Sequence, residues 1–460
     1  MPEQLVPRAV VLGGSLAGLL AANVLAEVYP EVLVVDRDEL AGVAGPRRGV
    51  PHGRHAHGLV ARGQQILEKQ FPGLLSDMEA AGIRPGDFSG DIRWYFNGMR
   101  LSPAQTGLLS VPCTRPVIER IVRSRVQKVR GIRFLEQHDI VGLETRPDAG
   151  RVTGVRVQPR DGSSGVEVLR ADLVIDTTGR GSRTPAWLEE LGYARPAEDK
   201  VKVDLAYTTR HFRVPRDPFG KNIAIIAAAT PSHPRGAFYY RLPGDDGRVE
   251  LSLTGVLGDH PPTDPEGFLE FVRSLPVPEI YESVREAEPI DDAVTFRFPA
   301  SVRRRYERLA RFPEGLLVMG DAVCTFNPVY AQGMAVAAIQ SRILAEQLRK
   351  DPVPAPSEFF REIARQIDSP WEFAAIADLG YAGVEGPRSP KVRMINAYIA
   401  RLQRAAVHDA SLTNAFMRVA GLIDEPTALL RPGHVLRTLR QFRARGSQLS
   451  ASAPLQAARD

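Results

Sequence analysis

The chain has 460 residues, of which 43% are hydrophobic and 25% charged, and its formal net charge is +5. These values are ordinary for globular proteins, so they exclude disordered and fibrous classes, and the length allows two or three packed domains. Basic residues are interspersed with acidic ones along the chain, which favours no nucleic-acid partner.

The segment AVVLGGSLAGLLAANVLAEVYPEVLVVDRD, residues 9–38, contains two short β-branched runs separated by a glycine turn and an apolar helix. Its first half partly imitates a secretory signal, but a second strand has no place in such a signal, so the pattern predicts a βαβ unit. Gly13, Ser15 and Gly18 occupy the positions of a G-x-G-x-x-G motif, with Gly14 between the first two and Ser15 replacing the second glycine. The small residues allow a tight turn, close approach of a pyrophosphate and packing of the helix on the strand.

Asp36 ends the second run, 18 residues after Gly18. A carboxylate at this place accepts hydrogen bonds from a ribose diol. We therefore predict a dinucleotide site that includes Ala17 in the turn and Arg37 beside Asp36.

The loop AGVAGPRRGVPHGRHAHGL, residues 41–59, is too rich in glycine, proline and cations for a packed strand or helix. We expect it to fold around an anion or ligand, the alternative being disorder. His52, His55 and His57 crowd this loop without cysteine or carboxylate neighbours, so no metal site is expected. Two cysteines without metal-ligand spacing, and no apolar run of about 18 residues, predict a cytoplasmic protein without a transmembrane segment.

Further along, the pattern predicts an α/β framework interrupted by an antiparallel sheet. The expected elements are a helix at 60–68, a helix at 115–130 opening at Pro116, a strand at 132–135, strands within 142–157 and 167–176, strands at 203–214, 222–229, 237–242 and 249–257, a strand at 316–319, a helix at 331–348, and helices within 354–439.

Three separated segments, GGSLAGL, ADLVIDTTGRGSRT and GLLVMGDAVCTFNPVYAQGMAVA, occur in an order that resembles the FAD-dependent monooxygenases of the aromatic-hydroxylase fold. The stretches GVPHGRHAHGL and FNPVYAQGM are more narrowly similar to actinobacterial epoxidases, relatives of squalene epoxidase that oxidise polyene precursors of polyether antibiotics.

The resemblance implies a Rossmann-like FAD-binding domain with an inserted antiparallel-sheet substrate domain and a C-terminal helical region, in the α/β (α+β) class. We expect the first part of the FAD-binding domain at 1–200, the inserted domain at 201–300, the second part at 301–350, the helical region at 351–445 and a loose tail at 446–460.

The resemblance also assigns cofactor contacts to the two later segments. Asp321 would accept hydrogen bonds from the ribityl hydroxyls, and the helix after Gly333 would direct its N-terminus at the pyrimidine end of the flavin. Arg115, at a helix start, would meet the flavin side of the site. The remaining expected contacts are Asp176, Gly179, Gly320, Pro328 and Met334.

One segment departs from the family pattern. Aromatic hydroxylases have an Asp-Gly pair that serves FAD and pyridine nucleotide, whereas here two threonines separate Asp176 from Gly179. No second G-x-G-x-x-G motif follows a strand. We therefore expect electrons either from transiently bound NAD(P)H or from a separate flavin reductase.

In the resembled enzymes, reduced flavin and oxygen form a C4a-hydroperoxide, which attacks an alkene without a protein nucleophile. Arg54, His55 and Tyr330 are therefore the expected active-site residues, with the first two lining the flavin and Tyr330 as a hydrogen-bond donor. The substrate would be a large apolar polyketide or terpenoid. Candidate pocket residues are Tyr207, Phe212, Phe238, Tyr239, Tyr240 and Phe296.

Four alternatives remain beside epoxidation. A halogenase would carry a W-x-W-x-I-P stretch, in which none of Trp94, Trp187 and Trp371 lies. A prenyl-chain reductase shares the fold and is separated by its product. An aromatic hydroxylase differs in pocket shape and needs a base for a phenol, and a flavin-binding partner protein would show no turnover.

Overall fold

The first unit of the fold is a parallel sheet that begins as the sequence predicts. The computed structural model describes residues 6–163, 165–244 and 246–440. Strand β1 (Arg8–Leu12), helix α1 (Leu16–Leu25) and strand β2 (Glu31–Val35) form the βαβ unit. The sheet has five strands in the order β19-β12-β1-β2-β8, with β8 at Ile132–Leu135, β12 at Leu173–Asp176 and β19 at Leu316–Val318.

The register of this sheet places three predicted motifs at one edge. Leu12 pairs with both Val35 and Asp176, and Asp176 pairs with Val318. The carboxyl ends of the four strands are therefore level, and the turns that follow them lie side by side. Ligands of open α/β sheets bind in the crevice outside such strand ends.

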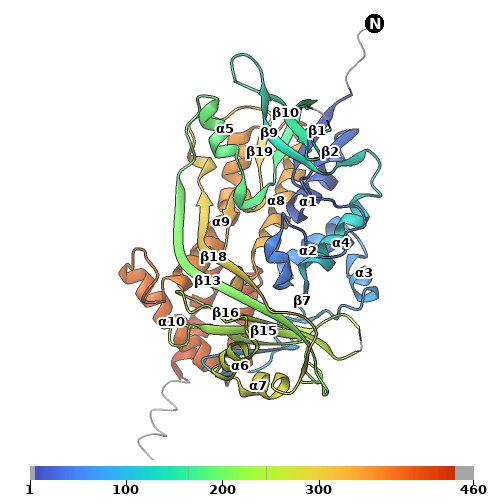
Figure 1. Cartoon of the computed structure of the whole chain (residues 1–460). Helices are drawn as coiled ribbons and strands as arrows, with labels where there is room; N and C mark the ends of the chain where they lie inside the picture. Colours follow the sequence, from blue (N-terminus) through green and yellow to red (C-terminus); the bar gives the residue numbers. More distant parts are fainter. Residues whose placement is uncertain (1–5, 164, 245, 441–460) are drawn as a thin grey trace, which may run out of the picture.

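Helices and a small sheet cover the parallel sheet (Figure 1). Helix α1 packs against α4 (Arg115–Val126) and α8 (Gly333–Leu348), and its apolar residues belong to the largest core cluster. An antiparallel meander of β9 (His138–Thr145), β10 (Val152–Pro159) and β11 (Glu167–Arg170) packs against β12. Val155 of the meander and Val174 of the parallel sheet share one buried cluster.

The second large sheet is antiparallel in most of its pairs and includes the four predicted strands. These are β13 (Glu198–Arg213), β14 (Ala224–Ala228), β15 (Arg235–Arg241) and β16 (Arg248–Gly255). The sheet is completed by β5 (Ile92–Phe96), β6 (Met99–Arg100), β17 (Glu288–Pro289), β18 (Val294–Arg304) and β20 (Cys324–Thr325). Strand β5 comes from before residue 200 and pairs in parallel with β14, so the sheet is not limited to the expected range 201–300.

The two faces of the second sheet have different neighbours. Helices α6 (Pro265–Arg273) and α7 (Pro278–Val284) pack on the face that carries Phe212, Tyr239 and Leu251. The opposite face carries Tyr207 and Phe238, because side chains alternate along a strand. It meets a small sheet of β3 (Ala56–Leu59), β7 (Leu109–Thr114) and β4 (Gly86–Asp87).

Helices fill the remaining surfaces. The C-terminal region contains α9 (Pro356–Asp378), α10 (Pro390–Ala406) and α11 (Ala410–Ala420), whereas α2 (Ala61–Gln70), α3 (Leu74–Ala80) and α5 (Thr184–Glu190) belong to the first half of the chain. The expected tail at 446–460 lies outside the described residues. In the part of the chain that is described, no helix is both long and apolar enough to cross a membrane.

Candidate active site

The glycine turn after β1 is held so tightly that its glycines cannot be exchanged. Gly13 has a φ of +98°, and the Thr177 hydroxyl donates hydrogen bonds to the carbonyls of Leu12 and Gly13 at 2.7 and 3.0 Å. A Cβ atom on Gly18 would lie 1.8 Å from the Gly13 carbonyl oxygen. The N–H groups of Gly13 and Gly14 bond to Val35 and Asp36, so the N–H groups available to a phosphate are those of the first turn of α1.

Asp36 lies at the end of β2, beside this turn, and is 7% exposed. It accepts hydrogen bonds from the backbone N–H groups of Gly14 and Asp38 at 2.6 and 2.8 Å. Burial raises the pKa of Asp36, and the guanidinium of Arg47, 3.5 Å away, opposes this rise. Its position is the one expected for a ribose ligand. The neighbouring Arg37 is exposed and lies 3.6 Å from Asp139.

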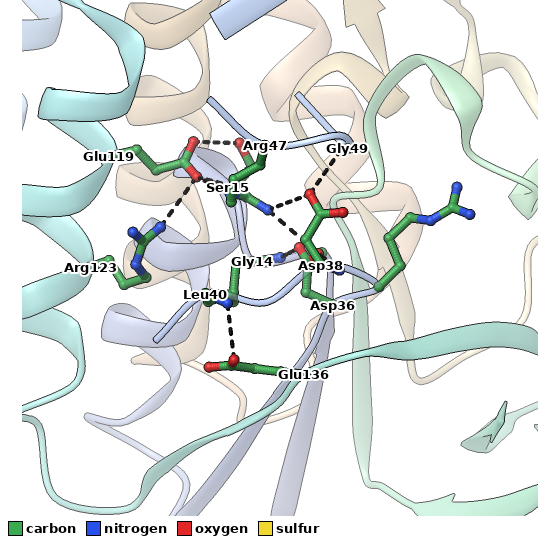
Figure 2. A network of polar contacts seen from close by, with 12 residues as sticks. Gly14, Ser15, Asp36, Asp38, Leu40, Arg47, Gly49, Glu119, Arg123 and Glu136 are labelled. Carbon is green, nitrogen blue, oxygen red and sulfur yellow. Dashed lines mark hydrogen bonds and ion pairs between the residues drawn. The ribbon is translucent and has the colours of Figure 1, made fainter. Parts of the chain in front are cut away.

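The loop at 41–59 is ordered by one buried arginine (Figure 2). Arg47 donates to Asp38 at 3.1 Å and pairs closely with Glu119 of α4, in addition to its contact with Asp36. The loop thus folds around carboxylates of the protein itself. Although burial opposes it, Arg115 and Arg47 lower the pKa of Glu119.

Glu119 also connects this loop to the glycine turn. The Ser15 hydroxyl donates to Glu119 at 2.9 Å, and Arg115 donates to Ser15 at 3.1 Å. Arg115 therefore lies beside the glycine turn at the start of α1, and its expected contact with the flavin side of the site stays a prediction.

The turn after β12 is stabilised from within. Asp176 accepts hydrogen bonds from the backbone and hydroxyl of Thr178, at 2.8 and 2.6 Å, and from the hydroxyls of Ser182 and Thr184, at 2.5 and 2.6 Å. Both of its oxygens are thus used inside the turn. Asp176 therefore holds the turn that carries Gly179, whose φ is +77°, and its expected contact with the cofactor stays a prediction.

Gly179 lies close to the third motif, which follows β19. A Cβ atom built on it would lie 4.0 Å from Cβ of Asp321, and one built on Gly320 would lie 2.9 Å from Cβ of Ala17. Burial raises the pKa of Asp321, while Arg115 and Arg180 oppose this rise. The structure therefore brings the predicted residues of all three motifs to one edge.

The loop that leads into α8 carries an unsatisfied amide. Pro328 begins a short 3-10 turn, Ala331 has a φ of +53°, and α8 begins at Gly333, with Met334 buried behind it. Gln332 is 1% exposed, and neither its amide nitrogen nor its amide oxygen has a hydrogen-bond partner among the described residues. Such orphan groups are costly unless a ligand satisfies them. The carbonyl and N–H groups on the pyrimidine edge of FAD match this amide.

Tyr330 has a partner that sequence reasoning missed. Its hydroxyl donates to Asp378 of α9 at 2.8 Å, and Asn327 donates to the same oxygen at 2.9 Å. Burial raises the pKa of Asp378 to about 7. The signal is present in the sequence, because Asp378 continues the buried stripe of α9 formed by Ile367, Trp371 and Ala374.

The expected active-site residues of the histidine-rich loop differ in their exposure to solvent. Arg54 is exposed, whereas His55 is 3% exposed and lies 2.9 Å from the Thr209 hydroxyl through Nδ1. Burial and the neighbouring cations lower the pKa of both His52 and His57. The residues that the structure describes contain no group of three or more His, Cys, Asp or Glu side chains that could hold a metal ion.

A large apolar cavity adjoins the loop at 327–332. Its volume is about 960 Å³, within the range of small-molecule sites, and its walls come from the second sheet, β3, and helices α9 to α11. Its aromatic lining includes Tyr207, Phe238, Tyr240, Phe88, Trp94 and Phe416.

Three of the six expected pocket residues, Tyr207, Phe238 and Tyr240, therefore line the cavity. Phe212 and Tyr239 were wrong as pocket residues, because they point to the opposite face of their strands and pack near α6 and α7. Phe296 instead contacts His55, with ring centroids 5.7 Å apart.

Several known proteins are similar to most of this chain. "Protein Rv3254" of Mycobacterium tuberculosis is 33% identical over 91% of this chain and 90% of its own length. "Digeranylgeranylglycerophospholipid reductase 2" of Methanopyrus kandleri is 27% identical, covering 73% of this chain and 75% of that protein. "Kynurenine 3-monooxygenase" of Salinispora arenicola is 27% identical, covering 83% and 80%.

A solved structure, that of flavin-dependent brominase Bmp2, has the same fold at 14% identity, with a TM-score of 0.65 over 96% of this chain and 99% of that one. The family described as FAD binding domain matches residues 7–350. The glycine cradle, the orphan amide of Gln332 and the cations beside the turn all fit FAD. The chain therefore belongs to the FAD binding domain family.

Proposed function

We propose that the protein epoxidises an alkene of a large apolar polyketide or terpenoid. The observation that carries this proposal is the shared wall between the cavity and the cofactor motif. Asn327, Tyr330 and Gln332 belong to the loop that opens α8, and all three also line the cavity. A substrate in the cavity would thus meet FAD directly.

The residues of the chain would bind the cofactor, orient the substrate and exclude water. Asp36 and Arg115 would hold the ribose and pyrophosphate, Asp321 the ribityl chain and Gln332 the pyrimidine edge. The bound flavin, once reduced, supplies activated oxygen. The aromatic lining keeps the site dry and orients a substrate double bond without a covalent bond to the protein.

The size of the cavity supports a substrate larger than one aromatic ring. Its volume of about 960 Å³ lies near the upper end of the range for small-molecule pockets. Helices α9 and α10 extend it through Phe373, Ile376, Ile395 and Ile399. Such a large, mostly apolar space suits an unsaturated chain, which gains affinity by burying its methylene and methyl groups.

Two other reactions have specific support. The similarity to the digeranylgeranylglycerophospholipid reductase favours reduction of a prenyl double bond, and the similarity to kynurenine 3-monooxygenase favours hydroxylation of an aromatic ring. The Tyr330–Asp378 pair at the cavity wall would be the group to deprotonate or orient a phenol. We rank epoxidation first because of the volume and apolar lining of the cavity.

Oxygen-18 labelling separates these reactions. The FAD-loaded protein is incubated with a flavin reductase, NADPH, oxygen-18 gas and an extract of polyketides and terpenoids from the producing strain. Epoxidation adds one labelled oxygen to an alkene, and the labelled product opens to a diol in acid. A labelled phenol would establish the hydroxylase, and a product that gains two hydrogens and no label would establish the reductase. Replacing Ala228 in the cavity wall with Trp should lower product formation, while Val168→Trp on the exposed strand β11 serves as the matched control.

A further inference from the structure

A line of polar side chains follows one face of the second sheet. Thr209 of β13 pairs across the strands with Ser252 of β16, and the next pair on the same face is His211 with Glu250. The Thr209 and Ser252 hydroxyl oxygens are 2.5 Å apart, and Ser252 donates to Glu250 at 3.1 Å. His211 Nε2 lies 3.3 Å from the second oxygen of Glu250. These four side chains are therefore continuously hydrogen-bonded.

The line has a residue at each end that completes it. At the inner end, His55 Nδ1 lies 2.9 Å from the Thr209 hydroxyl. At the outer end, His211 Nδ1 lies 2.5 Å from Asp291. We call the six residues His55, Thr209, Ser252, Glu250, His211 and Asp291 the polar line.

Solvent exposure increases along the polar line from its inner end at His55 to its outer end at Asp291. His55 is 3% exposed, and Thr209, Ser252 and Glu250 are at most 1% exposed. The side chain of His211 is 25% exposed and that of Asp291 is 44% exposed. The line therefore connects a site that solvent does not reach with the surface.

The inner end lies between the cavity and the flavin-binding turns. The ring of His55 has its centroid 5.8 Å from that of Tyr207, which lines the cavity. It also lies 5.7 Å from Phe296, the cross-strand partner of Tyr207, whose ring is 5.2 Å from the guanidinium of Arg180 in the turn after β12. One aromatic ring thus separates His55 from the turn after β12, and Tyr207 separates it from the cavity.

The donor and the acceptor of each hydrogen bond in the polar line can be assigned, because each hydroxyl has a single hydrogen. The backbone N–H of Ala56 donates to the Ser252 oxygen at 2.9 Å, and Ser252 gives its own hydrogen to Glu250. The short contact between the hydroxyls then requires Thr209 to donate to Ser252. It follows that His55 carries its hydrogen on Nδ1 and leaves Nε2 free to accept a proton. The reverse order requires rotation of both hydroxyls and a His55 that carries its hydrogen on Nε2 instead of Nδ1.

The two histidines of the polar line differ in pKa as well as in exposure. Burial and the Arg54 guanidinium lower the pKa of His55 to about 4. Although burial opposes it, hydrogen bonds to Glu250 and Asp291 raise the pKa of His211 to about 9. The remaining titratable groups near Glu250 are Tyr240 of β15 and Cys113 of β7, and burial raises the pKa of both. At neutral pH the outer end is therefore protonated and the inner end is neutral.

We propose that the polar line conducts protons from solvent at Asp291 to His55 beside the flavin. The proposal rests on the monooxygenase chemistry and is independent of the identity of the substrate. A monooxygenase inserts one oxygen atom and releases the other as water. When NAD(P)H supplies a hydride, the reaction also consumes one proton, and this proton must come from outside the cavity.

In the inward direction every broken bond is replaced by a new one. His211 protonates Glu250 and is refilled from solvent through Asp291. Glu250 gives its proton to Ser252, Ser252 gives its own to Thr209, and Thr209 gives its own to Nδ1 of His55. The passage starts from the tautomer of His55 that carries its hydrogen on Nε2, and His55 releases that hydrogen to the departing oxygen as Nδ1 receives the one from Thr209. The passage thus ends in the hydrogen order derived above, and before the next one both hydroxyls rotate back and His55 exchanges its hydrogen from Nδ1 to Nε2.

The test uses no substrate, so failure of the proposed epoxidation does not affect it. Reduced FAD-loaded protein is mixed with oxygen in a stopped-flow instrument, where reoxidation to hydrogen peroxide consumes one proton per flavin. Thr209→Val keeps the shape of the side chain and removes the hydroxyl. We expect reoxidation to slow by about 100-fold, the contribution typical of a positioned proton donor. Added imidazole or formate should partly restore the rate.

Thr208→Val is the matched control. Thr208 is the adjacent residue on β13, is also buried, and donates to the Pro261 carbonyl at 2.7 Å on the other face, away from the polar line. Its reoxidation rate should equal that of the wild type. Equal rates in wild type and Thr209→Val, or equal losses in the two variants, would overturn the proposal.

If Thr209→Val does not fold, a second variant and a spectroscopic measurement still test the proposal. Glu250→Gln retains the volume and the hydrogen-bond acceptor but cannot pass a proton, so it should slow reoxidation similarly. In protein labelled with nitrogen-15 histidine, nuclear magnetic resonance should show His55 protonated on Nδ1 and His211 titrating near pH 9. In Glu250→Gln the pKa of His211 should fall. A wild-type His55 protonated on Nε2 throughout the neutral range would contradict the hydrogen order.

Discussion

The Tyr330 hydroxyl donates a hydrogen bond of 2.8 Å to Asp378, and this contact ties the loop before α8 to the end of α9. Asp378 is 1% exposed, and its second oxygen has no hydrogen-bond partner among the described residues. Burial outweighs the hydrogen bonds from Tyr330 and Asn327, so the pKa of Asp378 is raised to about 7. A carboxyl group that titrates near neutrality therefore supports a wall of the cavity.

Asp378 should make the stability of the protein depend on pH. Because its pKa is higher in the folded than in the unfolded chain, its contribution is complete below about pH 4 and is lost as the pH rises through about 7. Asp378→Asn imitates the protonated form. The free energy of unfolding of this variant, relative to wild type, should rise between pH 5 and pH 8 by up to about 3 kcal/mol. Urea unfolding across this range measures the difference, with Asp148→Asn on an exposed turn as the control. A constant difference would show that Asp378 is ionised throughout.

Removal of the Asp36 carboxylate should weaken FAD binding by about 1–3 kcal/mol, because the ribose hydroxyls lose their acceptor. Asp139→Ala removes an exposed carboxylate beside Arg37 and should leave the affinity unchanged. Calorimetric titration of the apoprotein gives both values. FMN lacks the adenosine that Asp36 addresses and should bind more weakly than FAD. Equal affinities for FMN and FAD would refute the assignment of Asp36.

Gly18→Ala should abolish flavin binding. The new Cβ atom would lie 1.8 Å from the Gly13 carbonyl oxygen, so α1 must move away from β1 and the phosphate cradle opens. Gly181→Ala is the control, because no atom lies within 4 Å of its Cβ position. The ratio of bound flavin to protein after purification, read from absorbance, should fall to near zero in the first variant and stay unchanged in the second. Full flavin content in Gly18→Ala would mean that the turn is less rigid than its contacts indicate.

NADPH alone should reduce the bound flavin slowly, and a separate flavin reductase should accelerate turnover. The reason is that Asp176 is occupied within its own turn and leaves no carboxylate there for a pyridine nucleotide. Anaerobic stopped-flow reduction with NADPH, compared with turnover in the presence of reductase, measures both rates. Saturable reduction by NADPH as fast as turnover would assign the reductant site to this chain.

The parts of the site that follow strands could be predicted from sequence, because their geometry is local. The turn at Gly13, the acid at Asp36 and the Gly320–Asp321 pair each come within a few residues of a β-branched or apolar run. The partners that hold them could not be predicted, because they are distant in the chain. Glu119 is 104 residues from Ser15, and Asp378 is 48 residues from Tyr330. The same reason explains β5, whose place in the second sheet depends on pairing with β14.

The proposed substrate cavity has two walls that are encoded in different stretches of the chain. The cofactor side lies within residues 7–350, whereas α9, α10 and α11 follow that stretch. Substitutions in α9, α10 and α11 can therefore reshape the cavity without touching the three cofactor motifs. Asp378 is the exception, since it lies on α9 and bonds to Asn327 and Tyr330 of the loop on the cofactor side. A change of this one carboxyl group would disturb both walls at once.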